Sequence, residues 1–307
     1  MLKKIAQGLV IGLVLYFWGV YLYRSWSDLA AYQWEVNYTF LFLGYLFSSL
    51  SSFGLGFIWR WLIAKMGWRL DLGLALRIWF SSMFTRYTPG KVWHVVGRVY
   101  LSRQEGVSGA DAFLSMALEQ ALAFLATIIV FLFSLIFWVE GRSMAESWPL
   151  ILLIPLLLAL VHPRLFAPLL NFGLRILRRP EVELTLQYRE LLIFLVYYLA
   201  PALLNGLALY FVLRSLYPLA LERLPMVVGA ASLAWLVGYL SFLVPAGLGV
   251  REGILVILLS SCSPLPVATA TSLLSRILIT IAEGMWVMIT NLWAGRGLVR
   301  PAKEGRG

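Results

Sequence analysis

The sequence predicts an all-α integral membrane protein with about six transmembrane helices and two re-entrant helical hairpins, arranged as a 3+3 inverted repeat. Three observations support this. The 307-residue chain is 61% hydrophobic and 13% charged, with a mean hydropathy of +0.84, far from the range of water-soluble domains. Long apolar stretches recur along it, and proline–glycine breaks interrupt two further apolar regions. We therefore expect one polytopic membrane domain over residues 1–307.

Six apolar stretches are candidates to cross a hydrocarbon core of ~30 Å. They are residues 5–23, 38–64, 113–139, 148–160, 191–213 and 268–293. The first follows Lys3 and Lys4, as the apolar part of a secretory signal would. Trp18 and Tyr21 lie at its far end and no small-residue cleavage site follows, so we expect a retained membrane anchor.

Two apolar regions, 72–100 and 226–261, contain a break near the middle. Proline has no amide hydrogen to donate and glycine readily adopts positive φ, so each break favours a sharp turn between two half-helices. The residues that make the breaks are Pro89, Gly90, Pro245, Gly247 and Gly249. We expect each region to enter and leave the membrane on the same side.

The basic residues predict the orientation of the chain. We place Lys3 and Lys4 in the cytoplasm and assume that neither hairpin crosses the membrane. Among the basic residues of the connecting segments, only Arg24, Arg142, Arg214 and Arg223 then lie on the outer side. This asymmetry agrees with the positive-inside rule. It predicts an inner (plasma) membrane protein with both termini in the cytoplasm, whose first hairpin enters from the cytoplasm and whose second enters from outside.

Dividing the chain into residues 1–140 and 141–307 gives two halves of opposite orientation. Each half has three spans and one hairpin, as in many transporters. Pro89 and Pro245 are each followed by a glycine eight residues later. Glu119 follows Pro89 by thirty residues, and Arg276 follows Pro245 by thirty-one. These spacings favour an inverted repeat.

The two breaks imply a polar cavity, because non-helical backbone at membrane depth must be buried in protein or hydrated. Half-helix N-termini offer free amide groups to an anion there. Lys91, Arg98 and Arg251 add fixed positive charge near the breaks, which favours a phosphate-bearing headgroup. The alternative is that Arg86, Lys91 and Arg98 reach the headgroup region and only stabilise the topology.

Glu119 and Arg276 are charges in the middle of predicted spans, so each should face the interior of the bundle. One interpretation is that they pair with each other as a static clasp. In the other, they pair with neighbouring charges and change partners during transport. Those neighbours are Arg98, Arg251, Glu252 and Glu283.

Other polar or small residues within the spans have a packing interpretation. Proline and asparagine at Pro201 and Asn205 predict a kink in the fifth span that borders the cavity. Small residues interrupt the second span and predict close helix packing. They are Ser48, Ser49, Ser51, Ser52, Gly54 and Gly56.

Several chemistries find no support in the sequence. Cys262 is the only cysteine, and His94 and His162 are the only histidines, so a disulfide within the chain is excluded and a metal site is not expected. No nucleophile elbow or phosphate-binding loop occurs, so we expect neither an enzyme nor a cofactor. The formal charge of +10 is dispersed among apolar spans, which argues against a nucleic-acid partner.

Two motifs carry a family resemblance. They are Tyr87-Thr88-Pro89-Gly90-Lys91-Val92-Trp93 with Gly97-Arg98, and the run from Val244 to Gly253, VPAGLGVREG. Together they resemble the lysylphosphatidylglycerol synthase/flippase transmembrane domain family over nearly the whole chain. The resemblance implies the lipid-flipping membrane part of that family, without the cytoplasmic synthase domain, and leaves the lipid substrate open.

The sequence thus favours a lipid flippase that binds a phosphate-bearing headgroup between the hairpins. Its partners would be membrane lipids, either anionic or zwitterionic phospholipids or lipid-linked sugars. A homo-oligomer or a partner enzyme is left open. An integral-membrane transferase acting on lipids or glycolipids, or an accessory subunit of one, is the main alternative, and a scaffold with a purely structural cavity is a third.

Overall fold

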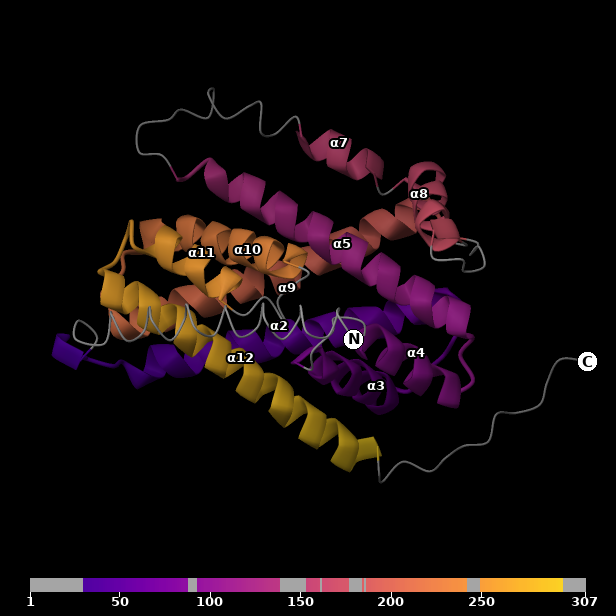
Figure 1. The fold of residues 1–307 in the computed structure, drawn as a ribbon, viewed down its shortest axis with the longest axis horizontal. Coiled ribbons are helices and arrows are strands. Elements are labelled where there is room, and N and C mark those ends of the chain that lie inside the picture. Colours follow the sequence, from indigo (N-terminus) through magenta and orange to yellow (C-terminus); the bar gives the residue numbers. More distant parts are fainter. Residues whose placement is uncertain are drawn as a thin grey trace, which may run out of the picture.

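The computed structural model describes residues 30–87, 93–138, 153–160, 162–176, 184, 186–241 and 249–294. These residues form a bundle of α-helices without strands (Figure 1). The predicted anchor at 5–23 lies outside the described residues, as do Lys91 and four of the break residues: Pro89, Gly90, Pro245 and Gly247. Gly249 is described, and its φ of 84° confirms the positive φ expected at the second break.

Five helices of the described part are long and apolar enough to cross a membrane. They are α2 (Tyr38–Lys65), α5 (Gly109–Leu135), α9 (Tyr188–Leu216), α10 (Leu224–Leu240) extended by the 3₁₀ turn η2 (Leu221–Arg223), and α12 (Leu265–Ala294). Four of them match predicted spans and confirm an all-α membrane protein. The other, α10, was expected as a hairpin arm, yet with η2 it reaches 20 residues.

The expected span at 148–160 is described only in part, because residues 148–152 lie outside the described residues. The described part is the helix α7 (Leu153–Leu160), and α8 (Pro163–Ile176) follows. Leu165, Leu169 and Phe172 recur along one side of α8 and are exposed, which is typical of a helix lying in the membrane interface.

Each broken region forms two helices, as predicted. The first contains α3 (Leu72–Phe84), the 3₁₀ turn η1 (Thr85–Tyr87) and α4 (Trp93–Gln104), and the second contains α10 and α11 (Val250–Leu259). Within each region the two helices contact each other along their length. Below, these pairs are called the first and second hairpins.

The two hairpins lie against opposite ends of α12, as Figure 1 shows. On the C-terminal half of α12, Asn291 accepts a hydrogen bond from Arg77 of α3 at 3.1 Å, and the rings of Phe80 and Trp286 stack with centroids 5.6 Å apart. On the N-terminal half, Ser272 donates to the backbone oxygen of Glu252 in α11 at 3.4 Å. The described residues nearest the two breaks therefore both contact the middle part of α12, Arg86 at Glu283 and Glu252 at Arg276.

Local capping fixes where the long helices begin. Asn37 accepts a hydrogen bond from the amide of Phe40 at the start of α2, and Ser108 accepts one from Asp111 at the start of α5. Such caps satisfy amide groups that have no partner within the helix. Of the six small residues of α2 predicted to pack closely, the four serines and Gly56 are buried and Gly54 is half-buried.

Candidate functional site

A cavity of about 450 Å³ lies between the two hairpins and the long helices. Its lining comes from α2, α3, α4, α5, α9, α10, α11 and α12. Pro201 and Asn205 border it, as the sequence predicted, and so do Ser51 and Ser52. The charged residues in its wall are Arg86, Glu119, Arg251, Arg276 and Glu283.

Arg98 and Glu119 form an ion pair enclosed by protein. The guanidinium of Arg98, which is fully buried, donates to the carboxylate of Glu119, which is 2% exposed. Trp79 donates its indole N–H to the other Glu119 oxygen at 2.9 Å, and Arg98 Nε donates to Ser82 Oγ at 3.0 Å. The Arg98 guanidinium also lies 5.2 Å from the ring of Trp59. The alternative that Arg98 extends to the membrane interface is therefore wrong.

Glu252 binds two arginines at once. Nη1 of Arg251 and Nη1 of Arg276 each lie 3.3 Å from Glu252 Oε1. The other carboxylate oxygen of Glu252 accepts a hydrogen bond from the backbone N–H of Gly249 at 2.7 Å. This hydrogen bond caps the first turn of α11, directly after the break. Ser275 accepts a hydrogen bond from Arg251 at 3.4 Å. Two cations thus share one carboxylate at the cavity wall.

Arg86 and Glu283 form an ion pair between the first hairpin and α12. Arg86 lies in η1, where α3 ends, and its guanidinium donates to the Glu283 carboxylate. The Glu283 side chain is 4% exposed, whereas that of Arg86 is 30% exposed. Both residues line the cavity. This pair connects the ingoing arm of the first hairpin to the helix that the second hairpin also contacts.

Of the two interpretations of Glu119 and Arg276, the clasp between them is wrong. Glu119 pairs with Arg98 and Arg276 pairs with Glu252. In both halves, therefore, the outgoing arm of a hairpin forms an ion pair with the span that follows it. The sign is reversed between the halves, because the arm carries the cation in the first and the anion in the second.

The charges around the cavity do not balance. Among the described residues, four arginines (Arg86, Arg98, Arg251 and Arg276) meet three glutamates (Glu119, Glu252 and Glu283). The network therefore carries one net positive charge inside an apolar bundle, where charge is weakly screened. A single negative charge would neutralise it.

Sequence reasoning missed two uncharged polar residues of the wall. Gln120 of α5 and Tyr198 of α9 line the cavity. Gln120 directly follows Glu119, so a polar pair within an apolar helix was the available signal. Tyr198 lies three residues before Pro201, and nothing in its spacing distinguished it from the other tyrosines of α9.

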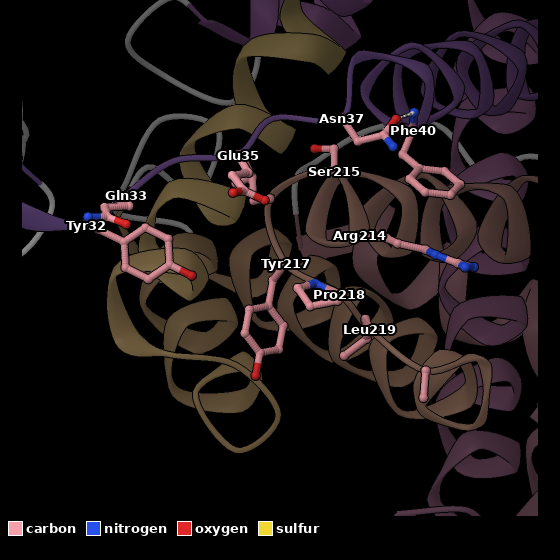
Figure 2. A pocket seen from close by; sticks show the side chains of 12 residues that line it. Tyr32, Gln33, Glu35, Asn37, Phe40, Arg214, Ser215, Tyr217, Pro218 and Leu219 are labelled. Carbon is pink, nitrogen blue, oxygen red and sulfur yellow. Dashed lines mark hydrogen bonds between the residues drawn. The ribbon is translucent and has the colours of Figure 1, made fainter.

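A second pocket, of about 560 Å³, lies where α2 begins and α9 ends (Figure 2). The Arg214 guanidinium lies 4.6 Å from the Phe40 ring centroid and donates to the Tyr210 hydroxyl at 3.3 Å. The other polar side chains of this pocket include Gln33 and Glu35, which are exposed. Of its charged groups, Glu35 is exposed and Arg214 is half-buried, in contrast to the buried Arg98–Glu119 pair beside the central cavity.

Comparison with known families gives one match. The profile of the lysylphosphatidylglycerol synthase TM region matches residues 5–283, which is most of the chain. The matched range contains both hairpins and every charged residue that lines the cavity. A comparison with curated proteins gave no match.

Proposed function

Because the chain belongs to the lysylphosphatidylglycerol synthase TM region family, we propose that it is a lipid translocase. It moves a phosphate-bearing headgroup through the central cavity while the acyl chains stay in the bilayer. The observation that carries the proposal is a cavity with charged side chains in its wall, belonging to a network of net positive charge among the described residues, inside an apolar helical bundle. Buried charges within a membrane are costly and usually belong to a substrate pathway.

The proposed topology has six crossings and two re-entrant hairpins, with both termini in the cytoplasm. Two observations support it. The hairpins contact opposite ends of α12, and each half pairs its outgoing arm with the following span. Halves of opposite orientation can alternate between a cavity open to one side and a cavity open to the other.

The phosphate site of this proposal is formed by Arg251 and Arg276. Guanidinium groups match phosphate oxygens in charge and geometry, and both side chains line the cavity. Sharing Glu252 holds the two groups close together. Lys91, from the first break, is the third cation proposed to contact the phosphate.

Arg98 has a different place in this proposal. It is enclosed against Glu119, so its predicted contact with the phosphate requires their ion pair to separate. The proposed step between the inward-open and outward-open states breaks the ion pairs of Glu119, Glu252 and Glu283. Each glutamate then pairs with a different arginine. A ligand shifts that equilibrium only through a difference in affinity for the two states.

Arg251→Ala tests the phosphate site. Losing a charge-assisted hydrogen bond should slow headgroup translocation by the purified protein in liposomes by about 10–100-fold. The protein should remain folded, because Glu252 keeps its contact with Arg276. Arg214→Ala, at the second pocket, is the matched control and should translocate at the wild-type rate. Undiminished translocation by Arg251→Ala would contradict the proposal.

A further inference from the structure

Helix α8 carries apolar and basic side chains on adjoining sides. Leu165, Leu169 and Phe172 follow one another at spacings of four and three residues, and each is more than half exposed. Arg164 and Arg175 are eleven residues, or about three turns, apart, so they share the neighbouring side, and both are exposed. The sequence of α8 contains no acidic residue. The helix therefore presents an apolar stripe with a row of positive charge beside it.

The contacts of the segment before α8 place the helix at the level of a membrane surface. The Tyr188 hydroxyl, at the start of α9, donates to the backbone oxygen of Leu158 in α7 at 3.2 Å. The ring of Tyr188 also lies beside that of His162, which directly precedes α8, with centroids 4.8 Å apart. In the same turn of α9, Glu190 pairs with the exposed Lys65 at the end of α2. Exposed charges at the ends of two spans mark where these spans leave the hydrocarbon, so α8 begins at that level.

One side of α8 is attached to the bundle and another side is open. Phe166 packs against the core cluster that includes Leu191 and Phe194 of α9. The backbone N–H of Arg164 donates to Nδ1 of His162 at 3.2 Å, which caps the start of the helix. Figure 1 shows α8 at the edge of the bundle. The apolar stripe is therefore available to whatever surrounds the protein at this level.

A bilayer surface with anionic headgroups fits both features of α8. Apolar side chains of an interfacial helix insert at the boundary between headgroups and acyl chains, and arginines beside them extend to the phosphates. Near an anionic surface, each arginine strengthens binding about fivefold. A second copy of the chain, bound symmetrically through the same face, would bring the arginines of both copies together, and like charges repel.

We infer that α8 binds anionic lipids of the bilayer, with Leu165, Leu169 and Phe172 inserted below the headgroups and Arg164 and Arg175 in contact with their phosphates. This surface is separate from the central cavity, none of whose lining residues belongs to α8. The inference therefore does not depend on the proposed phosphate site. Because α8 lies in the segment that joins α5 to α9, bound lipid fixes the connection between the two halves of the chain to one membrane surface.

Fluorescence quenching in liposomes tests this inference on the full-length protein. Cys262 is the only cysteine, so Cys262→Ser with Phe172→Cys places a single fluorophore on the apolar stripe. The liposomes contain phosphatidylcholine and phosphatidic acid in one fixed proportion, and either the first or the second lipid carries a nitroxide quencher on its acyl chain. Both lipids should quench the fluorophore. Phosphatidic acid should be preferred over phosphatidylcholine by about 5–25-fold, because two arginines contribute.

Replacing the two arginines separates the effect of charge from that of the apolar stripe. Arg164→Gln with Arg175→Gln should remove the preference for phosphatidic acid and keep the quenching by both lipids. Arg69→Gln with Arg103→Gln is the matched control, because it removes the same charge from two exposed arginines at the same end of the bundle. This control should keep the preference.

Three results would overturn the inference. The first is a folded protein whose fluorophore neither lipid quenches, since the stripe would then be covered by protein or lie away from the bilayer. The second is equal quenching by the two lipids when both arginines are present. The third is a preference for phosphatidic acid that the double replacement of Arg164 and Arg175 leaves unchanged.

Discussion

Arg98→Met alone is expected to destabilise the folded protein by about 3–5 kcal/mol, because it leaves the buried Glu119 carboxylate without its cation. Glu119→Met alone should have a similar effect on Arg98. Replacing both residues removes both charges together, and such double replacements are often neutral or stabilising. The yield of monodisperse protein and its thermal unfolding in detergent measure these effects.

The double variant also separates the two interpretations of the pair. If the pair rearranges during transport, Arg98→Met with Glu119→Met should fold as well as the wild type and translocate lipid much more slowly. A double variant with the full wild-type rate would show that the pair is structural only. Equal stability of the two single variants and the wild type would contradict the burial argument itself.

Glu252→Gln is the second substitution with a large expected effect. It removes the charge that holds Arg251 and Arg276 together, so two guanidinium groups would repel each other at the cavity wall. We expect a loss of about 3–5 kcal/mol of stability. Adding Arg276→Gln should restore part of it, because one cation is then removed as well. Thermal unfolding in detergent measures both.

Glu190→Gln provides the matched control for this prediction. Glu190 pairs with Lys65 at 3.0 Å on the surface, where the lysine side chain is 58% exposed. Exposed ion pairs contribute at most ~1 kcal/mol, so this variant should unfold close to the wild-type temperature. Equal shifts for Glu252→Gln and Glu190→Gln would contradict the assignment of Glu252 as the residue that organises the second hairpin.

Much of the fold could be predicted because the bilayer imposes a simple rule on helix length and polarity. The spans at α2, α5, α9 and α12 follow from long apolar stretches, and the two arms of each hairpin follow from the breaks at Pro89 and Pro245. Of the stretch at 148–160, residues 153–160 are described and are helical, and its crossing of the membrane stays a prediction.

The site was predicted less completely, because pairing depends on which helices are neighbours. Glu119 and Arg276 are both charges in the middle of predicted spans, so a pair between them was one of the two interpretations of the sequence. Instead, the short connections from α4 to α5 and from α11 to α12 place each span beside its own hairpin. Gln120 and Tyr198 were missed because single neutral polar residues in apolar helices are common and carry no spacing signal.

Native mass spectrometry of the purified protein tests the central claim most directly, namely that the cavity holds a phosphate-bearing lipid headgroup. The wild type should retain such a lipid. Ala202→Trp should lose it, because Ala202 lines the cavity and a bulky ring there would fill it without changing any charge. Equal retention of the lipid by the folded Ala202→Trp variant, or a wild type that retains no phosphate-bearing lipid, would contradict the account.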